Sequence, residues 1–320
     1  MKQRSNLRWE ETNMSEAVLE LRNITKSYNG KRVSDGIDMT IKRGDIYGLI
    51  GRNGAGKTTL TRLIASLSKP DHGELSLFGE TTEKGLLEAR RRMGCVIEMP
   101  ALYPHLTAKQ NLAYYQKLKG IPERDAVDKV LDIVGLTDTG KKKFKHFSLG
   151  MKQRLGIALA LLGSPDFLIL DEPTNGLDPM GIVEMREFIK RLNVDFGITI
   201  LISSHLLGEL SLLATRYGIL EQGKMVKELT AEELAEACKE SLSIVVENTA
   251  KAAQILETHL NTTNFKLISD TEIRLYDGFD NPADINYLLV QNGIRVQSIQ
   301  AHGANLEDYF MELVGGNPHA

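Results

Sequence analysis

Short apolar runs alternate with stretches of helical periodicity through the larger, N-terminal part of the chain. The runs Ile46–Ile50, Phe167–Leu170 and Thr199–Ile202 have the length and composition of strands that are buried on both faces. A helix is predicted from Leu60 onward, after the first run and a short loop, and another over Gly181–Val194, between the other two runs. Strands that alternate with helices predict an α/β fold with a parallel sheet.

Other patterns complete this first region. From about residue 86 to residue 165 the sequence is predicted to be mostly helical, most clearly over 109–118 and 126–134. We expect a helical subdomain over about 98–165. Alternating apolar residues predict three further strands, at Val18–Leu21, Ile37–Ile41 and Leu75–Phe78.

A second, smaller domain is predicted after a helix-opening capping box at Thr230–Glu233. Strands and helices then follow in the order β-α-β-β-α-β, which is a ferredoxin-like α+β unit, and a final amphipathic helix follows. The strands are expected at 242–247, 265–268, 272–276 and 294–299, and the helices at 250–260, 281–293 and 306–313. We therefore divide the chain into a mobile polar tail (1–16), an α/β domain (17–229) and an accessory domain (230–320).

Composition narrows the function classes. The 320 residues carry 39 Lys and Arg against 42 Asp and Glu, a net charge of −3, so the basic excess typical of nucleic-acid proteins is missing. Cys95 and Cys238 match no metal spacing. No apolar run approaches the length of about 18 residues that a membrane span needs. We expect a soluble chain without a nucleic-acid partner, whose membrane role, if it has one, comes through another protein.

A phosphate-binding loop with the pattern G-x-x-x-x-G-K-[ST] lies between the first buried run and its helix. The glycines let successive N–H groups point inward at a phosphate, and the helix N-terminus adds partial positive charge. Lys57 can reach the β- and γ-phosphates, and the Thr58 hydroxyl can ligate Mg²⁺. A chance glycine-rich turn is the alternative. The residues expected at the nucleotide are Gly51, Asn53, Gly54, Ala55, Gly56, Lys57, Thr58 and Thr59.

Two carboxylates, Asp171 and Glu172, directly follow the buried run 167–170. Ligands of open α/β sheets collect at the carboxyl ends of strands, so Asp171 is placed to hold Mg²⁺. Glu172 can accept a proton from, or orient, the water that attacks the γ-phosphate. His205 ends the next strand, where an imidazole could hold the γ-phosphate. The alternatives are an ordinary acidic loop and a structural histidine.

A second helix start carries candidate chemistry at Ser148 and Gly150. Ser148 is a good helix N-cap, which is the simpler interpretation. A hydroxyl and a close glycine at a helix N-terminus also suit a second phosphate site. The nearby run Lys141–Lys143 is either a solvated loop or a patch that faces lipid or a partner.

At this point the chain resembles the ATPase subunit of ATP-binding cassette (ABC) transporters, over about residues 18–226. The matching motifs are a Walker A loop at 51–59, a signature at 148–153, a Walker B run at 167–172, a D-loop that ends at Asp178, and the switch histidine His205. Asp178 is expected at the nucleotide through this resemblance. Tyr28 fits the aromatic residue that stacks on adenine in the family, and an ordinary turn tyrosine is its alternative.

Two departures from the family pattern narrow the resemblance. The usual signature Leu-Ser-Gly-Gly-Gln is replaced by Phe147–Met151, which keeps the Ser and the second Gly. The loop that leads into the helical subdomain has Glu98 where the family has Gln. Glu98 would then be a further Mg²⁺ ligand, unless it points to solvent. These departures and the C-terminal extension are similar to the subgroup that exports or resists peptide antibiotics, as in bacitracin and lantibiotic immunity systems.

The resemblance implies a mechanism and partners. Two chains would form a head-to-tail homodimer, or pair with a closely related subunit, around two ATP molecules, and each site would use the other chain's signature. The dimer would drive a membrane permease from the cytoplasmic face of the cell membrane. A soluble ABC protein acting on ribosomes or DNA, a transporter for a different substrate, and a sensing role of the accessory domain are the alternatives.

Overall fold

The computed structural model describes residues 16–98, 102–238, 241–279, 281–302 and 306–314. The tail expected to be mobile (1–16) lies outside the described residues except for Glu16. The chain divides into two compact units, Met1–Ala231 and Glu232–Ala320. This division falls next to the boundary at residue 229 that the capping box predicts.

A six-stranded sheet forms the centre of the first unit, in the order β5-β6-β7-β3-β8-β9. The first five strands of this order are parallel, and β9 pairs antiparallel with β8. Every residue of β3, β6 and β7 is buried, which explains their continuous apolar sequences. The strands are β3 (Ile46–Ile50), β5 (Met93–Val96), β6 (Phe167–Asp171), β7 (Thr199–Ser204), β8 (Arg216–Glu221) and β9 (Lys224–Thr230).

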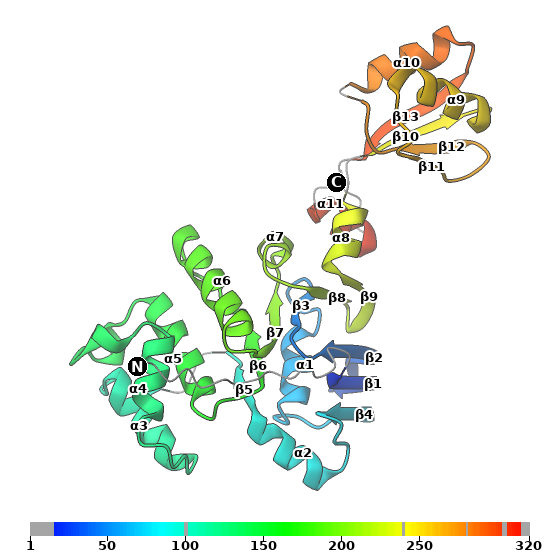
Figure 1. The fold of residues 1–320 in the computed structure, drawn as a ribbon. Helices are drawn as coiled ribbons and strands as arrows, with labels where there is room; N and C mark the ends of the chain where they lie inside the picture. The colour runs from blue at the N-terminus through cyan, green and yellow to red at the C-terminus, as the bar shows by residue number, and fades with distance from the viewer. Residues whose placement is uncertain (1–15, 99–101, 239–240, 280, 303–305, 315–320) are drawn as a thin grey trace, which may run out of the picture. The chain divides into compact units, whose positions relative to one another are not determined.

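An antiparallel sheet of three strands packs over helix α1 (Lys57–Ile64), on the opposite side of that helix from the central sheet (Figure 1). Its order is β2-β1-β4, with β1 (Ala17–Tyr28), β2 (Lys31–Lys42) and β4 (His72–Leu77). Leu60, Leu63 and Ile64 of α1 share one hydrophobic core with residues of both sheets. The helix that follows the phosphate loop is therefore fixed from two sides.

The helices of the first unit cover the central sheet and form a cluster beside it (Figure 1). In this cluster α3, α4 and α5 pack on one another, and α5 also contacts β5. The cluster lies within the range 98–165 expected for a helical subdomain. The helices are α2 (Glu83–Ala89), α3 (Ala108–Leu118), α4 (Ala126–Ile133), α5 (Leu149–Leu161), α6 (Pro179–Val194) and α7 (Leu207–Ser211).

Residues 86–165 are mostly helical as predicted, but they also contain β5, the edge strand of the central sheet, which was not predicted. Gly94 lies in this strand, and a side chain there would approach the backbone oxygen of Ala160 in α5 to 2.6 Å. Glycine at this position allows α5 to pack closely on the strand, but glycine is a poor β-former. The sequence pattern therefore does not indicate a strand here. The hairpin of β8 and β9 was not predicted either.

The second unit has the ferredoxin-like topology that its sequence predicts. Its four antiparallel strands lie in the order β11-β12-β10-β13. Leu242, Ile244 and Val246 of β10 are fully buried and form its core with α9 and α10. The elements are α8 (Ala231–Ala237), β10 (Ser241–Val246), α9 (Thr249–Leu260), β11 (Phe265–Leu267), β12 (Glu272–Leu275), α10 (Pro282–Gln291), β13 (Val296–His302) and α11 (Leu306–Leu313).

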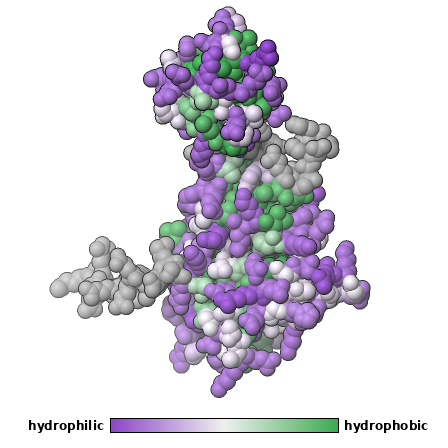
Figure 2. Space-filling model, turned by 90° about the vertical axis from the view of Figure 1, so that its right-hand side faces the viewer, coloured by the Kyte–Doolittle hydropathy of each residue, from purple (hydrophilic) through white to green (hydrophobic). Residues whose placement is uncertain are grey.

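Hydrophilic side chains cover most of the visible face of both units, and hydrophobic side chains form smaller patches (Figure 2). Within the described ranges, no helix is both long enough and apolar enough to cross a membrane.

A buried tyrosine ties the strand before the phosphate loop to β9. The hydroxyl of Tyr47, in β3, donates to Oε1 of Glu228 at 2.5 Å. Burial, together with the neighbouring Glu228 carboxylate, raises the pKa of Tyr47 well above 10. Gly218 of β8 leaves the room for this ring, because a side chain there would lie 2.3 Å from the tyrosine oxygen.

Tyr47→Phe is expected to lower the free energy of unfolding by about 1–3 kcal/mol at neutral pH, since Glu228 loses its donor. Above pH 10 an unfolded tyrosine releases its proton while the folded Tyr47 keeps it, so wild-type stability falls by about 1.4 kcal/mol per pH unit from this residue. The phenylalanine variant lacks this loss, and the stability gap should narrow. Urea unfolding of both proteins at neutral and alkaline pH measures this difference in the free energy of unfolding. A gap that stays constant would contradict the assignment.

Candidate functional site

The loop between β3 and α1 is built around glycines in unusual conformations. Gly56, directly before α1, has a φ of 111°, and a side chain there would lie 2.6 Å from the backbone oxygen of Val33. The loop is also held from outside, because the backbone N–H of Gly223, in the β8–β9 turn, donates to the oxygen of Ala55 at 2.9 Å. The loop is thus a fixed cradle that ends at a helix N-terminus.

Lys57 bridges this loop and the end of β6. Its ammonium donates to the backbone oxygens of Gly51 at 2.7 Å and Arg52 at 3.4 Å. It also pairs with Oε1 of Glu172 at 3.2 Å, and only 6% of its side chain is exposed. A buried cation is therefore already held at the mouth of the cradle, with an anion as its partner.

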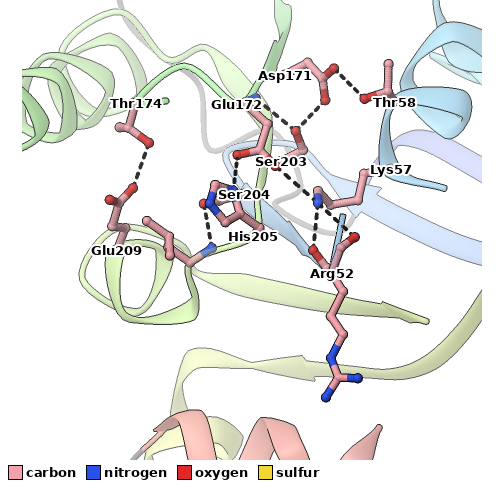
Figure 3. Close-up of polar contacts among 12 residues, drawn as sticks. Arg52, Lys57, Thr58, Asp171, Glu172, Thr174, Ser203, Ser204, His205 and Glu209 are labelled. Atoms are coloured by element: carbon pink, nitrogen blue, oxygen red, sulfur yellow. Dashed lines mark hydrogen bonds and ion pairs between the residues drawn. The ribbon is translucent and has the colours of Figure 1, made fainter. Parts of the chain in front are cut away.

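The two carboxylates after β6 point to different partners (Figure 3). Asp171 accepts from the Thr58 hydroxyl at 2.9 Å through Oδ2 and from the Ser203 hydroxyl at 2.5 Å through Oδ1. Glu172 lies 2.8 Å from Nδ1 of His205 through Oε2. The structure thus brings together the loop lysine, the hydroxyl, both carboxylates and the histidine that the sequence singles out.

A hollow of about 450 Å³ lies above the loop, which is within the range of small-ligand sites. Gly51 and Ala55, which were also predicted at the nucleotide, do not line this hollow. Asn175, the first residue of the D-loop, lies in the wall. Two residues at the site had no role predicted from the sequence: Val33 in the wall and Ser203, which contacts Asp171. The wall consists of Val33, Arg52, Asn53, Gly54, Gly56, Lys57, Thr58, Thr59, Glu172, Asn175 and His205.

The oxygens of Thr58 and Asp171 suit Mg²⁺, a hard cation that prefers oxygen ligands. No group of three His, Cys, Asp or Glu side chains among the described residues could hold a metal by itself. Mg²⁺ is usually bound through one or two carboxylates together with substrate phosphates, so this donor set fits a metal that arrives with a nucleotide.

Glu98, the third predicted metal ligand, lies apart from this pair. Its carboxylate forms an ion pair with Arg62, on the turn of α1 after Thr58. Its side chain is 61% exposed, and its backbone has a φ of 62°. The structure therefore gives Glu98 a partner on α1 and no contact with Asp171.

The predicted phosphate contacts at Ser148, Gly150 and Asp178 do not line this hollow. Ser148 accepts from the N–H of Met151 at 3.3 Å and caps α5. Asp178 accepts from the N–H of Gly181 at 2.8 Å and caps α6. Both side chains thus have the capping role that was the simpler interpretation of Ser148, and any phosphate they contact lies outside this chain's own hollow.

Tyr28, the predicted adenine contact, ends β1 beside the turn at Asn29 and does not line the hollow. Its hydroxyl lies 2.9 Å from Oγ of Ser68, and the ammonium of Lys26 lies 5.3 Å from the ring centroid. The residue remains 45% exposed, so its ring is accessible to solvent while its hydroxyl is held by Ser68.

Comparison with known proteins agrees with this geometry. Residues 34–175 match the family model described as ABC transporter. The chain is 43% identical over 299 residues to the bacitracin transport ATP-binding protein BcrA of Bacillus licheniformis, covering 93% of this chain and 98% of that protein. It is 42% identical over 211 residues to the lantibiotic transport ATP-binding protein SrtF of Streptococcus pyogenes, covering 66% of this chain and 90% of that protein.

Solved structures resemble about two thirds to three quarters of the chain. The protein cbiO1 of Clostridium perfringens, part of the ABC transporter complex cbiONQ, matches with a TM-score of 0.64 and 27% identity over 77% of this chain and 96% of its own. A dimeric ATP-binding cassette in a post-hydrolysis state with ADP and Pi matches with a TM-score of 0.60 and 26% identity over 67% and 98%. The chain therefore belongs to the ABC transporter ATP-binding proteins and is an ATPase of that family.

Proposed function

We propose that this chain is the ATP-hydrolysing subunit of a transporter that exports, or confers resistance to, a peptide antibiotic of the bacitracin or lantibiotic type. The observation that carries the substrate class is the length of the similarity to the bacitracin protein, which spans 98% of that relative and includes the second unit. The lantibiotic relative is matched over 66% of this chain, and its printed name supplies the second substrate class of the proposal.

The arrangement of side chains in the hollow supports a separate role for each of them in hydrolysis. Lys57 and the loop N–H groups bind the β- and γ-phosphates. Glu172 orients the attacking water or accepts its proton, and His205 holds the γ-phosphate and the Glu172 side chain. Thr58 and Asp171 would hold Mg²⁺, which when bound would neutralise charge that develops on the phosphates.

A head-to-tail dimer is the arrangement that gives Ser148 and Gly150 a nucleotide to contact. Both lie outside their own chain's hollow, and a solved relative of this cassette is dimeric. A second copy, or a closely related subunit, would place its α5 N-terminus over the hollow. Asp178, which starts α6, and Tyr28 would complete the nucleotide contacts.

A separate membrane permease completes the proposal and would hold the dimer at the cytoplasmic face of the membrane. Glu98 is the residue we assign to the link between the nucleotide and the helical subdomain. It pairs with Arg62 of α1, the helix that carries Thr58, and it lies at the start of the range expected for the subdomain. In this role it would exchange Arg62 for Mg²⁺ when nucleotide is bound.

Resistance assays with the assembled transporter test the substrate class. In a host sensitive to both peptide classes, this chain and the membrane protein that co-purifies with it should raise the inhibitory concentration of bacitracin or of a lantibiotic several-fold. The Lys57→Ala chain with the same permease should give no protection, because phosphate binding is lost. A complex that hydrolyses ATP and protects against neither class would contradict the substrate and leave the ATPase assignment standing.

A further inference from the structure

Ser203 is fully buried near the end of β7, directly opposite Asp171 of β6 and Leu49 of β3. Its hydroxyl has two partners, and both belong to the carboxylate pair. It donates to Oδ1 of Asp171 at 2.5 Å and accepts from the backbone N–H of Glu172 at 3.0 Å (Figure 3). A hydroxyl can donate once while it accepts, so a single oxygen atom fixes both residues.

The bond to Asp171 decides which of its oxygens faces the metal position. The terminal torsion of an aspartate is broad, so hydrogen bonds choose its orientation. Ser203 occupies Oδ1, and Oδ2 is thereby turned toward the Thr58 hydroxyl at 2.9 Å. Without Ser203 the carboxylate would lose one of its two fixed partners and could rotate away.

The bonds to Glu172 hold a backbone that is unfavourable by itself. Glu172 has a φ of 49°, in the left-handed region that a non-glycine residue seldom adopts. Its N–H donates both to Oγ of Ser203 and, at 3.2 Å, to the backbone oxygen of Ser203. This conformation turns the Glu172 side chain toward Lys57 and His205.

We propose that Ser203 is a positioning residue for ATP hydrolysis, which sets the metal-facing oxygen of Asp171 and the backbone of Glu172 through one hydroxyl. The proposal rests on the roles given to Asp171 and Glu172 under the proposed function. Burial alone does not explain these contacts. Ser34 is equally buried, and its hydroxyl has no hydrogen-bond partner among the described residues. Within the same part of the chain, the hydroxyl of the adjacent Ser204 accepts from the N–H of Leu206 and contacts neither carboxylate.

The test compares Ser203→Ala with Ser204→Ala, which removes an equally small hydroxyl one position along the same strand without touching either carboxylate. Removing the oriented partner of a metal-binding carboxylate typically costs about 10- to 100-fold in metal affinity or activity. For Ser203→Ala we expect kcat to fall by that order while the KM for ATP changes little. Ser204→Ala should stay close to wild type, and Ser203→Thr, which keeps the hydroxyl, should recover part of the loss.

A binding measurement separates positioning from general damage. Fluorescent ATP is titrated with the full chain, first in EDTA and then with increasing Mg²⁺. Ser203→Ala should bind like wild type in EDTA, because Lys57 and the loop are intact, and should need more Mg²⁺ for the metal-dependent increase. Thermal unfolding without nucleotide should show a somewhat lower midpoint for Ser203→Ala than for Ser204→Ala, because Asp171 loses a donor, with both chains folded at the assay temperature.

Two outcomes would overturn the proposal. One is a Mg²⁺ titration and kcat for Ser203→Ala that match those of Ser204→Ala. The other is a Ser203→Ala chain with weaker binding in EDTA that is partly unfolded at the assay temperature, which would make Ser203 merely structural. A wild-type chain without ATPase activity would instead reject the proposed function, and the Mg²⁺ titration would still report on Asp171.

Discussion

Glu172→Gln is expected to stop ATP hydrolysis while ATP binding persists. The amide has the shape of the carboxylate and retains an acceptor for Lys57, so the loop contacts survive. It cannot accept the proton of the attacking water, and general base catalysis of this kind contributes about 100- to 10,000-fold to rate. We therefore expect kcat to fall by at least about 100-fold, and the nucleotide-bound dimer to stay closed.

Phosphate release and the binding of fluorescent ATP measure the two effects in the same preparation. Glu209→Gln is the matched control, because Glu209 accepts from the Thr174 hydroxyl at 2.7 Å, near the same end of the sheet, and does not line the hollow. It should keep most of its activity. A Glu172→Gln chain that hydrolyses ATP at the normal rate would show that another group is the base.

Two inactive variants should restore activity to each other when mixed. Lys57→Ala removes the phosphate-binding ammonium, and Ser148→Arg removes the hydroxyl before α5 and fills its place with a long side chain. In a head-to-tail heterodimer both lesions fall in one composite site, and the second site is undamaged. If Ser148 acted on its own chain's nucleotide instead, each chain would carry a defect in its only site.

Different affinity tags on the two chains allow the heterodimer to be isolated before its ATPase activity is measured. Each variant alone should be inactive, and the heterodimer should regain a clearly measurable part of wild-type activity. Isolated heterodimers that remain inactive would count against the exchange of signatures between chains. Circular dichroism of Ser148→Arg checks that loss of the α5 cap, about 1 kcal/mol, has not unfolded the helix.

Sequence patterns predicted the strands whose neighbours impose one simple requirement. Because β3, β6 and β7 are buried on both faces, continuous apolar runs were a sufficient signal. Gly94 in β5 and Gly218 in β8 are instead required by close contacts with residues distant in sequence. Gly94 lies against the backbone of α5, and Gly218 lies against the ring of Tyr47. A pattern read along the chain does not contain such contacts, so these strands were missed.

The candidate site divides in the same way. The phosphate loop, Asp171, Glu172 and His205 were predictable because each directly follows a recognisable strand or lies within a local motif. Ser203 was not, although it lies two positions before His205, because its role depends on the register that sets it opposite Asp171. The ion pair of Glu98 with Arg62 likewise depends on the path of the chain around α1.

The ion pair between Lys57 and Glu172 affects the electrostatic gain when ATP enters the hollow. The lysine is not a free positive charge waiting for a phosphate, because Glu172 already serves as its resident counter-ion. Binding therefore exchanges one anion for another, and the attraction between ATP and Lys57 is offset by the attraction that Glu172 gives up. Under the proposed function, the same exchange frees the Glu172 carboxylate from the lysine, so that it can face the attacking water only once a phosphate has taken its place beside Lys57.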